Sequence, residues 1–388
     1  MKNTIASKYF SVEFCEYGGD AFVRVTPDWE YIKNIPEFKV LETTSQSPKW
    51  HSEGENVIDH VRLSVDAACK YFTDRSRYGE FDETTIYIVM LAVLFHDIGK
   101  GVTTKLGDDG LYHNPNHAVE GERITRRLLW DLGYFKREYI CKLVRYHMHP
   151  LEVVTKSDWL ERMFDLAHRC GGLRELALVK MFDLMGSKPT VPGAVEKSYN
   201  DLTKYLYSAK ALDIYDNKPA IGPKTNLNRF IVENTIKVYV MMGLPGAGKS
   251  TYVEQNFKGD DYVIVSRDLI RAELGYCAEG EKFIGDKEQE KHVTEIFNQK
   301  MLSAVAQNKT IVLDNMNNRR EYRDGYKKLL KEYNISWRYI YCEAPTLAHN
   351  IVRRSGQIDG ELFQGMINHF DMPMYEEFDR LSVIISKS

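Results

Sequence analysis

The sequence predicts two folded domains: an all-α helical bundle preceded by a small β-rich segment, and a parallel α/β domain after it. The chain has 388 residues, more than one hydrophobic core usually serves. Between about residues 56 and 185, apolar residues recur with the period of a helix. From about residue 237, short apolar strands alternate with helix-like segments, a pattern typical of a parallel sheet.

The composition favours a cytoplasmic protein with no membrane association. Apolar residues make up 43% of the chain and charged residues 28%, as in ordinary soluble globular proteins. The six cysteines are scattered without a CxxC pair, which suits a reducing compartment. The N-terminus lacks the apolar core of a signal peptide, and the longest apolar run, Ile86–Phe95, is about half the ~20 residues of a spanning helix. The net charge of −3 means that a nucleic acid would have to bind through local basic sites.

The predicted elements follow in order along the chain. Residues 8–42 alternate apolar and polar side chains around Gly18-Gly19, which predicts a hairpin with a two-residue turn. Helical periodicity marks residues 56–72, 84–95, 117–133, 139–148 and 173–185, and residues 199–213 fit one further helix. Strands are expected at residues 237–243, 261–266, 310–315 and 337–343. These patterns predict a β-rich segment at 1–47, a helical domain at 48–220, a linker at 221–235 and an α/β domain at 236–388.

The segment GLPGAGKST, residues 243–251, predicts a phosphate-binding loop. It fits the pattern G-x-x-x-x-G-K-[ST] and lies between a predicted strand and a helix-compatible stretch, as this motif requires. Glycines let backbone N–H groups converge on phosphate oxygens, and the helix N-terminus adds positive potential. Lys249 would reach the β- and γ-phosphates, and Ser250 would offer its hydroxyl to Mg²⁺. The residues expected to bind ATP, or another nucleoside triphosphate, with Mg²⁺ are Gly243, Pro245, Gly246, Gly248, Lys249, Ser250 and Thr251.

Asp268 and Arg271 suit a phosphoryl transfer. They follow the second predicted strand, at the edge of the sheet where ligands bind in open α/β folds. Asp268 could accept a proton from an attacking hydroxyl, and Arg271 could hold an acceptor phosphate. A helix N-terminal carboxylate beside a solvated arginine is an interpretation of equal weight.

This half resembles the 5′-polynucleotide kinases of the phage type over about residues 236–388. The family's R-D-x-x-R motif is matched by RDLIR, which implies Asp268 as the general base for a 5′-OH and Arg271 as the ligand of the acceptor's phosphate. The segment after the family's next strand is Asp-Thr-Asn-like and corresponds to LDNMNNRR here, with Asp314 and Asn315 as implied acceptor residues.

A basic segment follows the last predicted strand. Arg353 and Arg354 lie on a short helix-like stretch and could neutralise phosphate charge in the transition state, or form no more than a basic helix face. The lid motif of the kinase family is R-N-x-x-R, and the corresponding segment here is HNIVR, residues 349–353. His349 replaces the first arginine, so Arg353 alone carries over as the implied catalytic and ATP-binding arginine.

Histidines are concentrated in the helical half, where eight of the chain's eleven lie between residues 51 and 168. A lone core histidine is usually just hydrogen-bonded, whereas eight on one bundle, with a His96-Asp97 doublet, favour a metal centre. Hydrolysis of a phosphoester needs a strong nucleophile and charge relief, which two metal ions ~3.5–4 Å apart supply. Mixed nitrogen and oxygen ligands suit Mn, Fe, Co, Ni or Zn.

The helical half resembles the HD-superfamily phosphohydrolases over about residues 48–186. The implied metal ligands, from the H…HD…D signature and the extra histidines of two-metal members, are His60, His96, Asp97, His117, His147 and Asp183. Asp97 and Lys100 are the implied catalytic residues, Lys100 at a position that contacts substrate phosphate. The HD domain that follows tRNA nucleotidyltransferases is also similar, and its HPEG-like text makes His51 a competitor for a site role beside His60. His149 could replace His147, and His113 could assist.

An HD phosphoesterase followed by a polynucleotide kinase is the domain order of the bacterial bifunctional end-healing enzymes called HD-Pnk. This resemblance implies ATP-dependent phosphorylation of 5′-OH ends of RNA or DNA. It also implies removal of 2′,3′-cyclic phosphate and 3′- or 2′-phosphate ends, with a nucleic-acid ligase as a candidate partner.

Two alternatives stay open. One is an HD nucleotidase fused to a nucleoside or other small-molecule kinase, against which Arg271 argues mildly because a nucleoside has no phosphate to grip. The other is a non-catalytic NTP-binding switch.

Overall fold

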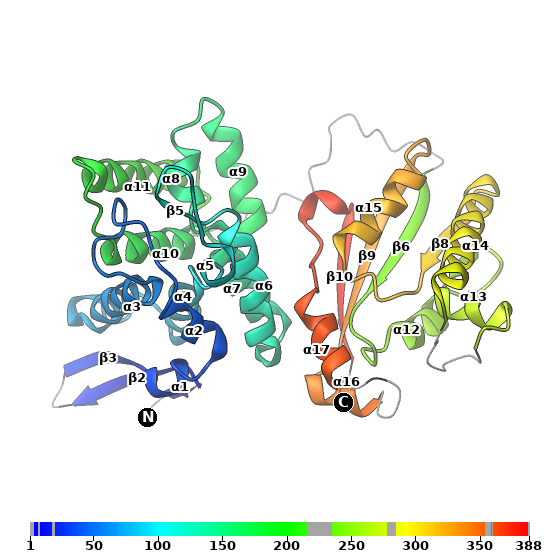
Figure 1. Ribbon diagram of the computed structural model, residues 1–388, viewed down its shortest axis with the longest axis horizontal. Coiled ribbons are helices and arrows are strands. Elements are labelled where there is room, and N and C mark those ends of the chain that lie inside the picture. The colour runs from blue at the N-terminus through cyan, green and yellow to red at the C-terminus, as the bar shows by residue number, and fades with distance from the viewer. Residues whose placement is uncertain are drawn as a thin grey trace. The chain divides into compact units, whose positions relative to one another are not determined.

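The structure, a computed structural model, describes residues 4–6, 8–17, 20–215, 235–277, 285–353, 358 and 360–386. The chain divides into two compact units, Met1–Ala220 and Ile221–Ser388. A helical bundle with a small β-rich segment forms the first unit and a parallel α/β fold the second, which confirms the predicted fold class (Figure 1). The predicted linker at 221–235 lies outside the described residues, apart from Thr235.

The first unit begins with a three-stranded antiparallel sheet of β1 (Thr4–Ala6), β2 (Phe10–Tyr17) and β3 (Asp20–Pro27). The pairing of β2 with β3 confirms the hairpin, whereas the expected Gly18-Gly19 turn lies outside the described residues. The prediction was wrong beyond Pro27, where the short helices α1 (Trp29–Ile32) and α2 (Pro36–Leu41) replace extended chain. The Asp28 side chain caps α1, and Pro36 starts α2, so local capping overrides the alternating pattern.

Nine helices of the described chain follow in the first unit. They are α3 (Val57–Thr73), α4 (Glu83–Phe95), α5 (Lys100–Thr103), α6 (His117–Leu128), α7 (Tyr134–Tyr146), α8 (His149–Val153), α9 (Trp159–Cys170), α10 (Leu173–Gly186) and α11 (Ala194–Ala211). Shorter pieces are η1 (Arg75–Arg77), η2 (Trp130–Leu132) and the two-stranded sheet of β4 (Lys105–Leu106) and β5 (Tyr112–His113). All five helices marked by periodicity are present, and α11 confirms the further helix.

Helix α4 is the centre of the bundle. Its residues Ile86–Phe95 are all buried, and α3, α7 and α10 pack around it (Figure 1). Within the described residues, Glu83–Thr103 is long and apolar enough to cross a membrane by length and composition alone, and 83% of its most apolar window is buried inside the fold. The position of α4 matters for function because its C-cap is His96, followed directly by Asp97.

The second unit is built on a five-stranded parallel sheet in the order β10-β9-β6-β8-β7. Its strands are β6 (Ile236–Met242), β7 (Tyr262–Val265), β8 (Thr310–Leu313), β9 (Ile335–Glu343) and β10 (Arg380–Ile385). The first four confirm the predicted strands. β10 was not expected, although Leu381, Val383, Ile384 and Ile385 make it apolar; it is an edge strand whose residues are half-buried or exposed.

The helices of the second unit connect these parallel strands. They are α12 (Lys249–Asn256), α13 (Arg267–Glu273), α14 (Lys287–Ala306), α15 (Arg320–Leu329), α16 (Leu347–Arg353) and α17 (Gly360–Asn368), with η3 (Tyr375–Glu377) before β10. Because the strands are parallel, the segments that leave their carboxyl ends meet at one edge of the sheet. The loops after β6, β7, β8 and β9 therefore bring the sequence-predicted kinase residues together.

A fully buried arginine joins α15 to the C-terminal part of this unit. The Arg323 guanidinium donates to Glu377, with Nε–Oε2 at 2.8 Å and Nη2–Oε1 at 3.2 Å. It also donates to the carbonyl oxygens of Asn317 and Asp371, at 3.1 and 3.0 Å. Removing one partner of such a pair leaves a buried charge without compensation.

We expect Arg323→Met to lower the free energy of unfolding by about 3–5 kcal/mol, because Glu377 and two carbonyls would lose their buried donor. Urea titration of the full chain, followed by circular dichroism and tryptophan fluorescence, measures the loss. Arg320→Met is the matched control on the same helix, since Arg320 makes an exposed 3.5 Å ion pair with Asp324. Equal losses for the two variants would contradict the expectation.

Candidate active sites in the two units

Six side chains from five parts of the bundle converge in the first unit. His60 comes from α3, His96 and Asp97 from the end of α4, His117 from the first turn of α6, His147 from the end of α7 and Asp183 from α10. All are buried apart from His117, which is half-buried. They are the six residues that the sequence singled out as candidate metal ligands, and the fold brings all of them together.

One part of this cluster contains His60, His96 and two carboxylates. The Nε2 atoms of His60 and His96 are 3.1 Å apart. Asp97 Oδ2 lies 3.6 Å from His60 Nε2 and 3.4 Å from His96 Nε2. Asp183 Oδ1 lies 3.1 Å from His60 Nε2 and 3.8 Å from His96 Nε2. His60, His96 and Asp97 form a candidate set of three ligands for one cation, and Asp183 Oδ1 lies close enough to both imidazoles to add a fourth.

The other part of the cluster uses the second oxygen of Asp97. Asp97 Oδ1 lies 3.5 Å from His117 Nε2 and 3.9 Å from His147 Nε2. The Nε2 atoms of His117 and His147 are 3.4 Å apart. Asp97 therefore presents one oxygen to each pair of imidazoles, which is the arrangement of a carboxylate that bridges two cations.

Hydrogen bonds on the outer side fix how these rings face inward. The Nδ1 atoms of His96, His117 and His147 lie 2.7, 2.9 and 2.8 Å from the backbone oxygens of Val93, Asn114 and Val144. A carbonyl only accepts, so each Nδ1 carries the hydrogen and, in the neutral ring, each Nε2 keeps its lone pair. Such lone pairs facing each other at close range suit a cation between them. The donor set thus fits two divalent transition metals.

The electrostatics of the cluster favour an ionised Asp97, a neutral His147 and a protonated His60. Burial alone would raise the pKa of Asp97, but Lys100 and His96 outweigh it and hold this pKa well below its usual value. Burial lowers the pKa of His147 well below its usual value, and the neighbouring His117 and His96 lower it further. Burial also acts to lower the pKa of His60, but hydrogen bonds to Asp183 and Glu53 outweigh it and raise the pKa to about 9. A metal ion at Nε2 would displace that proton.

The competing histidines lie outside the cluster. His51 is one step further out, with Nδ1 2.8 Å from Glu53 Oε1 and its ring 4.6 Å from that of His60. His149 packs against Tyr146, and His113 pairs with Asp109 on the β4–β5 hairpin. The geometry therefore favours His60 over His51 and His147 over His149 as inward-facing groups.

Two lysines neutralise the carboxylates. Lys100 is buried, with Nζ 2.6 Å from Asp97 Oδ2, and Lys180 Nζ lies 2.6 Å from Asp183 Oδ2. Lys100 was expected beside the doublet, whereas Lys180 and Glu53 were given no role from the sequence. The i, i+3 spacing of Lys180 to Asp183 was the available signal for the lysine.

The phosphate-binding loop of the second unit has the backbone that its glycines predict. Gly243, Gly246 and Gly248 have φ angles of 137°, 76° and 89°. At Gly243 a Cβ would lie 2.2 Å from the carbonyl oxygen of Cys342, so glycine is required. Lys249 starts α12 and donates from Nζ to the carbonyl oxygens of Gly243 and Leu244, at 2.9 and 3.0 Å.

The segment after β8 faces this loop. Burial raises the pKa of Asp314, while Lys249 and a hydrogen bond to Ser250 act to lower it. Asp314 therefore lies beside Lys249 and Ser250 of the phosphate-binding loop. Asn315 Oδ1 accepts a hydrogen bond from the backbone N–H of Arg267, at 3.0 Å.

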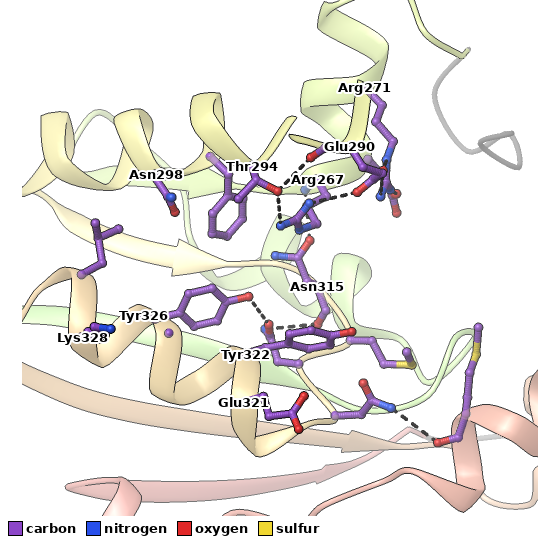
Figure 2. Close-up of a pocket in the computed structure, with 18 of the residues that line it drawn as sticks. Arg267, Arg271, Glu290, Thr294, Asn298, Asn315, Glu321, Tyr322, Tyr326 and Lys328 are labelled. Carbon is purple, nitrogen blue, oxygen red and sulfur yellow. Dashed lines mark hydrogen bonds and ion pairs between the residues drawn. The ribbon is translucent and has the colours of Figure 1, made fainter. Parts of the chain in front are cut away.

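Charged side chains from α13 and α14 form a network beside the loop (Figure 2). Asp268 is mostly exposed and accepts from Arg271 Nη1 at 2.6 Å. Arg271 Nε also donates to Glu290 Oε1 at 2.8 Å, and Arg267 donates to Glu290 Oε2 at 3.1 Å and to Thr294 Oγ1 at 2.9 Å. Both arginines are therefore held by carboxylates.

The lid-like segment on α16 contacts the phosphate-binding loop directly. Arg353 Nη1 lies 3.2 Å from the carbonyl oxygen of Gly246. Buried Asn350 donates from Nδ2 to the carbonyl oxygen of Pro245, at 2.9 Å. Arg354 lies outside the described residues. Asn350 is thus the residue that fastens this helix to the loop.

A pocket of about 1110 Å³ opens beside the network, between α14 and α15. Asp268, Arg271 and Asn315 line one part of it. Its remaining lining consists of Pro245, Arg267, Glu290, Thr294, Phe297, Asn298, Met316, Asn317, Asn318, Glu321, Tyr322, Gly325, Tyr326, Lys328, Leu329 and Met366.

Comparisons with known proteins assign both units to domain families. A family described as HD domain matches residues 57–170, and a family described as AAA domain matches residues 238–373. The chain is thus a fusion of an HD domain and a P-loop domain. It has the pairing and order that its resemblance to HD-Pnk enzymes implied. No curated protein matched in a sequence search.

Solved structures show distant similarity. A chain in a structure of the Pnkp1/Rnl/Hen1 complex is 20% identical with a TM-score of 0.24, covering 27% of this chain and 35% of that one. A chain in the Pnkp1/Rnl/Hen1 RNA repair complex is 19% identical with a TM-score of 0.29, covering 36% of this chain and 43% of that one. This chain therefore matches less than half the length of either, and the domain assignment rests on the two family matches.

We expect wild-type protein loaded with Mn²⁺ and desalted to retain two ions per chain by elemental analysis. His117→Ala should retain one, because its half of the cluster has only three candidate donors. Asp97→Ala should weaken both positions, because it removes one oxygen from each. His149→Ala is the control and should retain two. Equal metal content in the His117 and His149 variants would contradict the two-position arrangement.

Proposed function

We propose that the chain is a bifunctional nucleic-acid end-healing enzyme. Its P-loop domain would transfer the ATP γ-phosphate to a 5′-OH end, and its HD domain would hydrolyse 2′,3′-cyclic phosphate, phosphodiester and phosphomonoester ends. The observation that carries the proposal is Asp97, whose two oxygens each face a pair of imidazole nitrogens in a unit separate from the phosphate-binding loop. One chain thus carries the groups both to remove a phosphate and to add one.

In the HD domain, His60, His96 and Asp183 would hold one metal ion, and His117 and His147 the other, with Asp97 bridging them. Metal ions held there would supply activation of a water nucleophile and charge relief for the phosphate. The outward hydrogen bonds of His96, His117 and His147 keep their Nε2 atoms directed inward. Lys100 forms an ion pair with Asp97 and therefore lies close enough to the two metal positions to bind a phosphate oxygen of the substrate.

In the P-loop domain, the loop at 243–251 would bind the ATP phosphates, with Lys249 on the β- and γ-phosphates and Ser250 at Mg²⁺. Asp314, which the resemblance implied as an acceptor residue, is assigned instead to the Mg²⁺ side, because it lies beside Lys249 and Ser250 and does not line the pocket that contains Asn315. Asp268 would accept the proton of the attacking 5′-OH, which its exposed carboxylate at the sheet edge allows. Arg271 would bind the acceptor's phosphate, and Arg353, next to Gly246, would neutralise charge on the transferred group. Asn315 would complete the acceptor site.

The substrates of this proposal are RNA or DNA strands with a 5′-OH and a 2′,3′-cyclic or terminal phosphate. Such ends cannot be sealed until both are converted, so a nucleic-acid ligase is the proposed partner that uses the products. Arg271 supports a polynucleotide over a nucleoside acceptor, since a second phosphate is what a bidentate guanidinium would grip.

We expect Lys249→Ala and Asp268→Ala each to reduce 5′ phosphorylation by at least about 100-fold, the usual loss for a proton acceptor or a charge-stabilising group. Both should leave hydrolysis of the 2′,3′-cyclic phosphate unchanged, and Asp97→Ala should do the reverse. The assay is incubation of 5′-OH, 2′,3′-cyclic-phosphate RNA with ATP, Mg²⁺ and Mn²⁺, with both ends analysed. Joint loss of the two activities in any one of these variants would count against two separate sites.

A further inference from the structure

The pocket between α14 and α15 is larger than the proposed phosphoryl transfer needs. Asp268 and Arg271 line this pocket. Figure 2 shows that its lining extends from Arg271 to Tyr322, Tyr326 and Lys328. A volume of about 1110 Å³ exceeds what a hydroxyl and one phosphate would fill. The remainder is continuous with the acceptor residues, so it is available to another part of the acceptor.

Gly325 shows that packing does not account for this space. It lies inside α15, where glycine is destabilising relative to alanine because of its backbone entropy. Its φ is not positive, and an added Cβ would meet no atom within 4 Å. Neither the backbone nor a neighbouring side chain therefore demands glycine here. Gly325 instead leaves the pocket wall without a side chain.

Aromatic rings line the pocket next to Gly325. Phe297 and Tyr326 pack with ring centroids 5.6 Å apart, and the Tyr326 hydroxyl donates to Asn317 Oδ1 at 2.9 Å, which fixes this wall. Tyr322, one turn before Tyr326 on α15, is 48% exposed and lines the same pocket. An exposed tyrosine beside a fixed aromatic wall offers a stacking surface for a planar group.

Two amide groups add unpaired polar atoms to the lining. Among the described residues, Asn315 Nδ2 and Asn318 Oδ1 are buried without a hydrogen-bond partner. Asn318 is 1% exposed, and both asparagines are among the residues that line the pocket. Buried polar groups are normally hydrogen-bonded. Asn315 Nδ2 lacks an acceptor, and Asn318 Oδ1 lacks a donor. A nucleobase edge carries both kinds of atom, and its ring is the planar group that tyrosine stacks on.

We propose that this pocket binds the base of the nucleotide that carries the 5′-OH, with Tyr322 stacked on it and Gly325 leaving room for it. The inference rests on the proposed kinase function and assigns a second point of contact to its acceptor. The base then acts as a handle that places the 5′-OH at Asp268. A terminal nucleotide held in this way is unpaired while it reacts.

The test compares two 5′-OH oligonucleotides that differ only in an abasic first nucleotide. Wild type should show a KM about 5- to 100-fold higher for the abasic acceptor, the range expected for one base–aromatic stack. Tyr322→Ala and Gly325→Leu should raise the KM of the base-bearing acceptor to the abasic level and leave the KM for ATP unchanged. Neither should change the KM of the abasic acceptor.

Matched controls separate this role from a structural one. Gly365→Leu also adds a side chain to a helix glycine with no atom within 4 Å of its Cβ, and Tyr333→Ala removes another exposed tyrosine. Neither residue lines the pocket, and both variants should keep the wild-type preference. Equal KM values for the two acceptors in wild type would overturn the proposal, as would full preference in the Tyr322 and Gly325 variants. If wild type phosphorylates no 5′-OH strand, the kinase function itself fails, and this assignment with it.

A second inference comes from an independent observation in the HD domain. His96, His117 and His147 direct Nδ1 to backbone carbonyls, whereas His60 Nδ1 lies 3.1 Å from the Glu53 carboxylate. The Glu53 side chain is fully buried. Its Oε2 accepts from the backbone N–H of Lys188 at 2.8 Å, which fixes the carboxylate between two loops.

We infer that Glu53 is a positioning residue for His60. A carboxylate behind an imidazole orients the ring more firmly than a carbonyl does and makes its Nε2 a stronger donor. The metal position that contains His60 would thus depend on Glu53, whereas the position that contains His117 and His147 would not. The two positions are therefore expected to differ in their response to loss of this carboxylate.

Glu53→Gln keeps the size of the side chain and removes its charge. It should weaken Mn²⁺ binding at one of two positions by about 10- to 100-fold in calorimetry and leave the other unchanged. Glu53→Asp should restore part of the affinity, and Glu55→Gln is the control, since Glu55 is exposed two residues away. Unchanged binding at both positions in Glu53→Gln would overturn the inference, as would equal weakening of both.

Discussion

The HD domain is organised around one buried carboxylate. Asp97 lies at the end of a helix that is apolar on every side, and both of its oxygens face imidazole nitrogens from other helices. A buried charge is tolerated only with compensating partners. Lys100 supplies one at 2.6 Å, and a cation held between Asp97 and the imidazoles from α3, α6 and α7 would supply the other. The enclosing bundle satisfies this requirement, and its apolar centre, α4, makes the position of Asp97 rigid.

The P-loop domain compensates charge with backbone groups instead of side chains. Its anion site is made by positive-φ glycines and the start of α12, so few charged groups need to be buried. The parallel sheet then supplies the chemistry, because strands β6 to β9 deliver four loops to one edge. Arg323, a buried residue of α15, ties this wall of the neighbouring pocket to Asn317 after β8 and to Asp371 and Glu377 before β10.

The parts that the sequence predicted are those encoded locally. The loop 243–251 and the His96-Asp97 doublet each occupy contiguous residues. The pattern of the loop indicates its chemistry directly, and the doublet was identified through its resemblance to the HD signature. The choice of His60 over His51, and of His147 over His149, depends on which way each ring turns in the folded bundle. Glu53 was missed for the same reason, since its pairing with His60 is made by the tertiary fold. The alternating apolar and polar residues at 28–42 led to a wrong prediction of extended chain, because Asp28 and Pro36 start helices there.

The charge distribution explains why a base contact would matter to the proposed kinase. The chain has a net charge of −3, and the Arg267 and Arg271 guanidinium groups already contact Glu290. An incoming phosphate must compete with that carboxylate, so electrostatic attraction alone gives little affinity for a polyanion. Stacking and hydrogen bonds to a base do not depend on net charge. A pocket lined by Tyr322 and unpaired amides, continuous with Asp268, would therefore supply the binding energy that the charge of this domain does not.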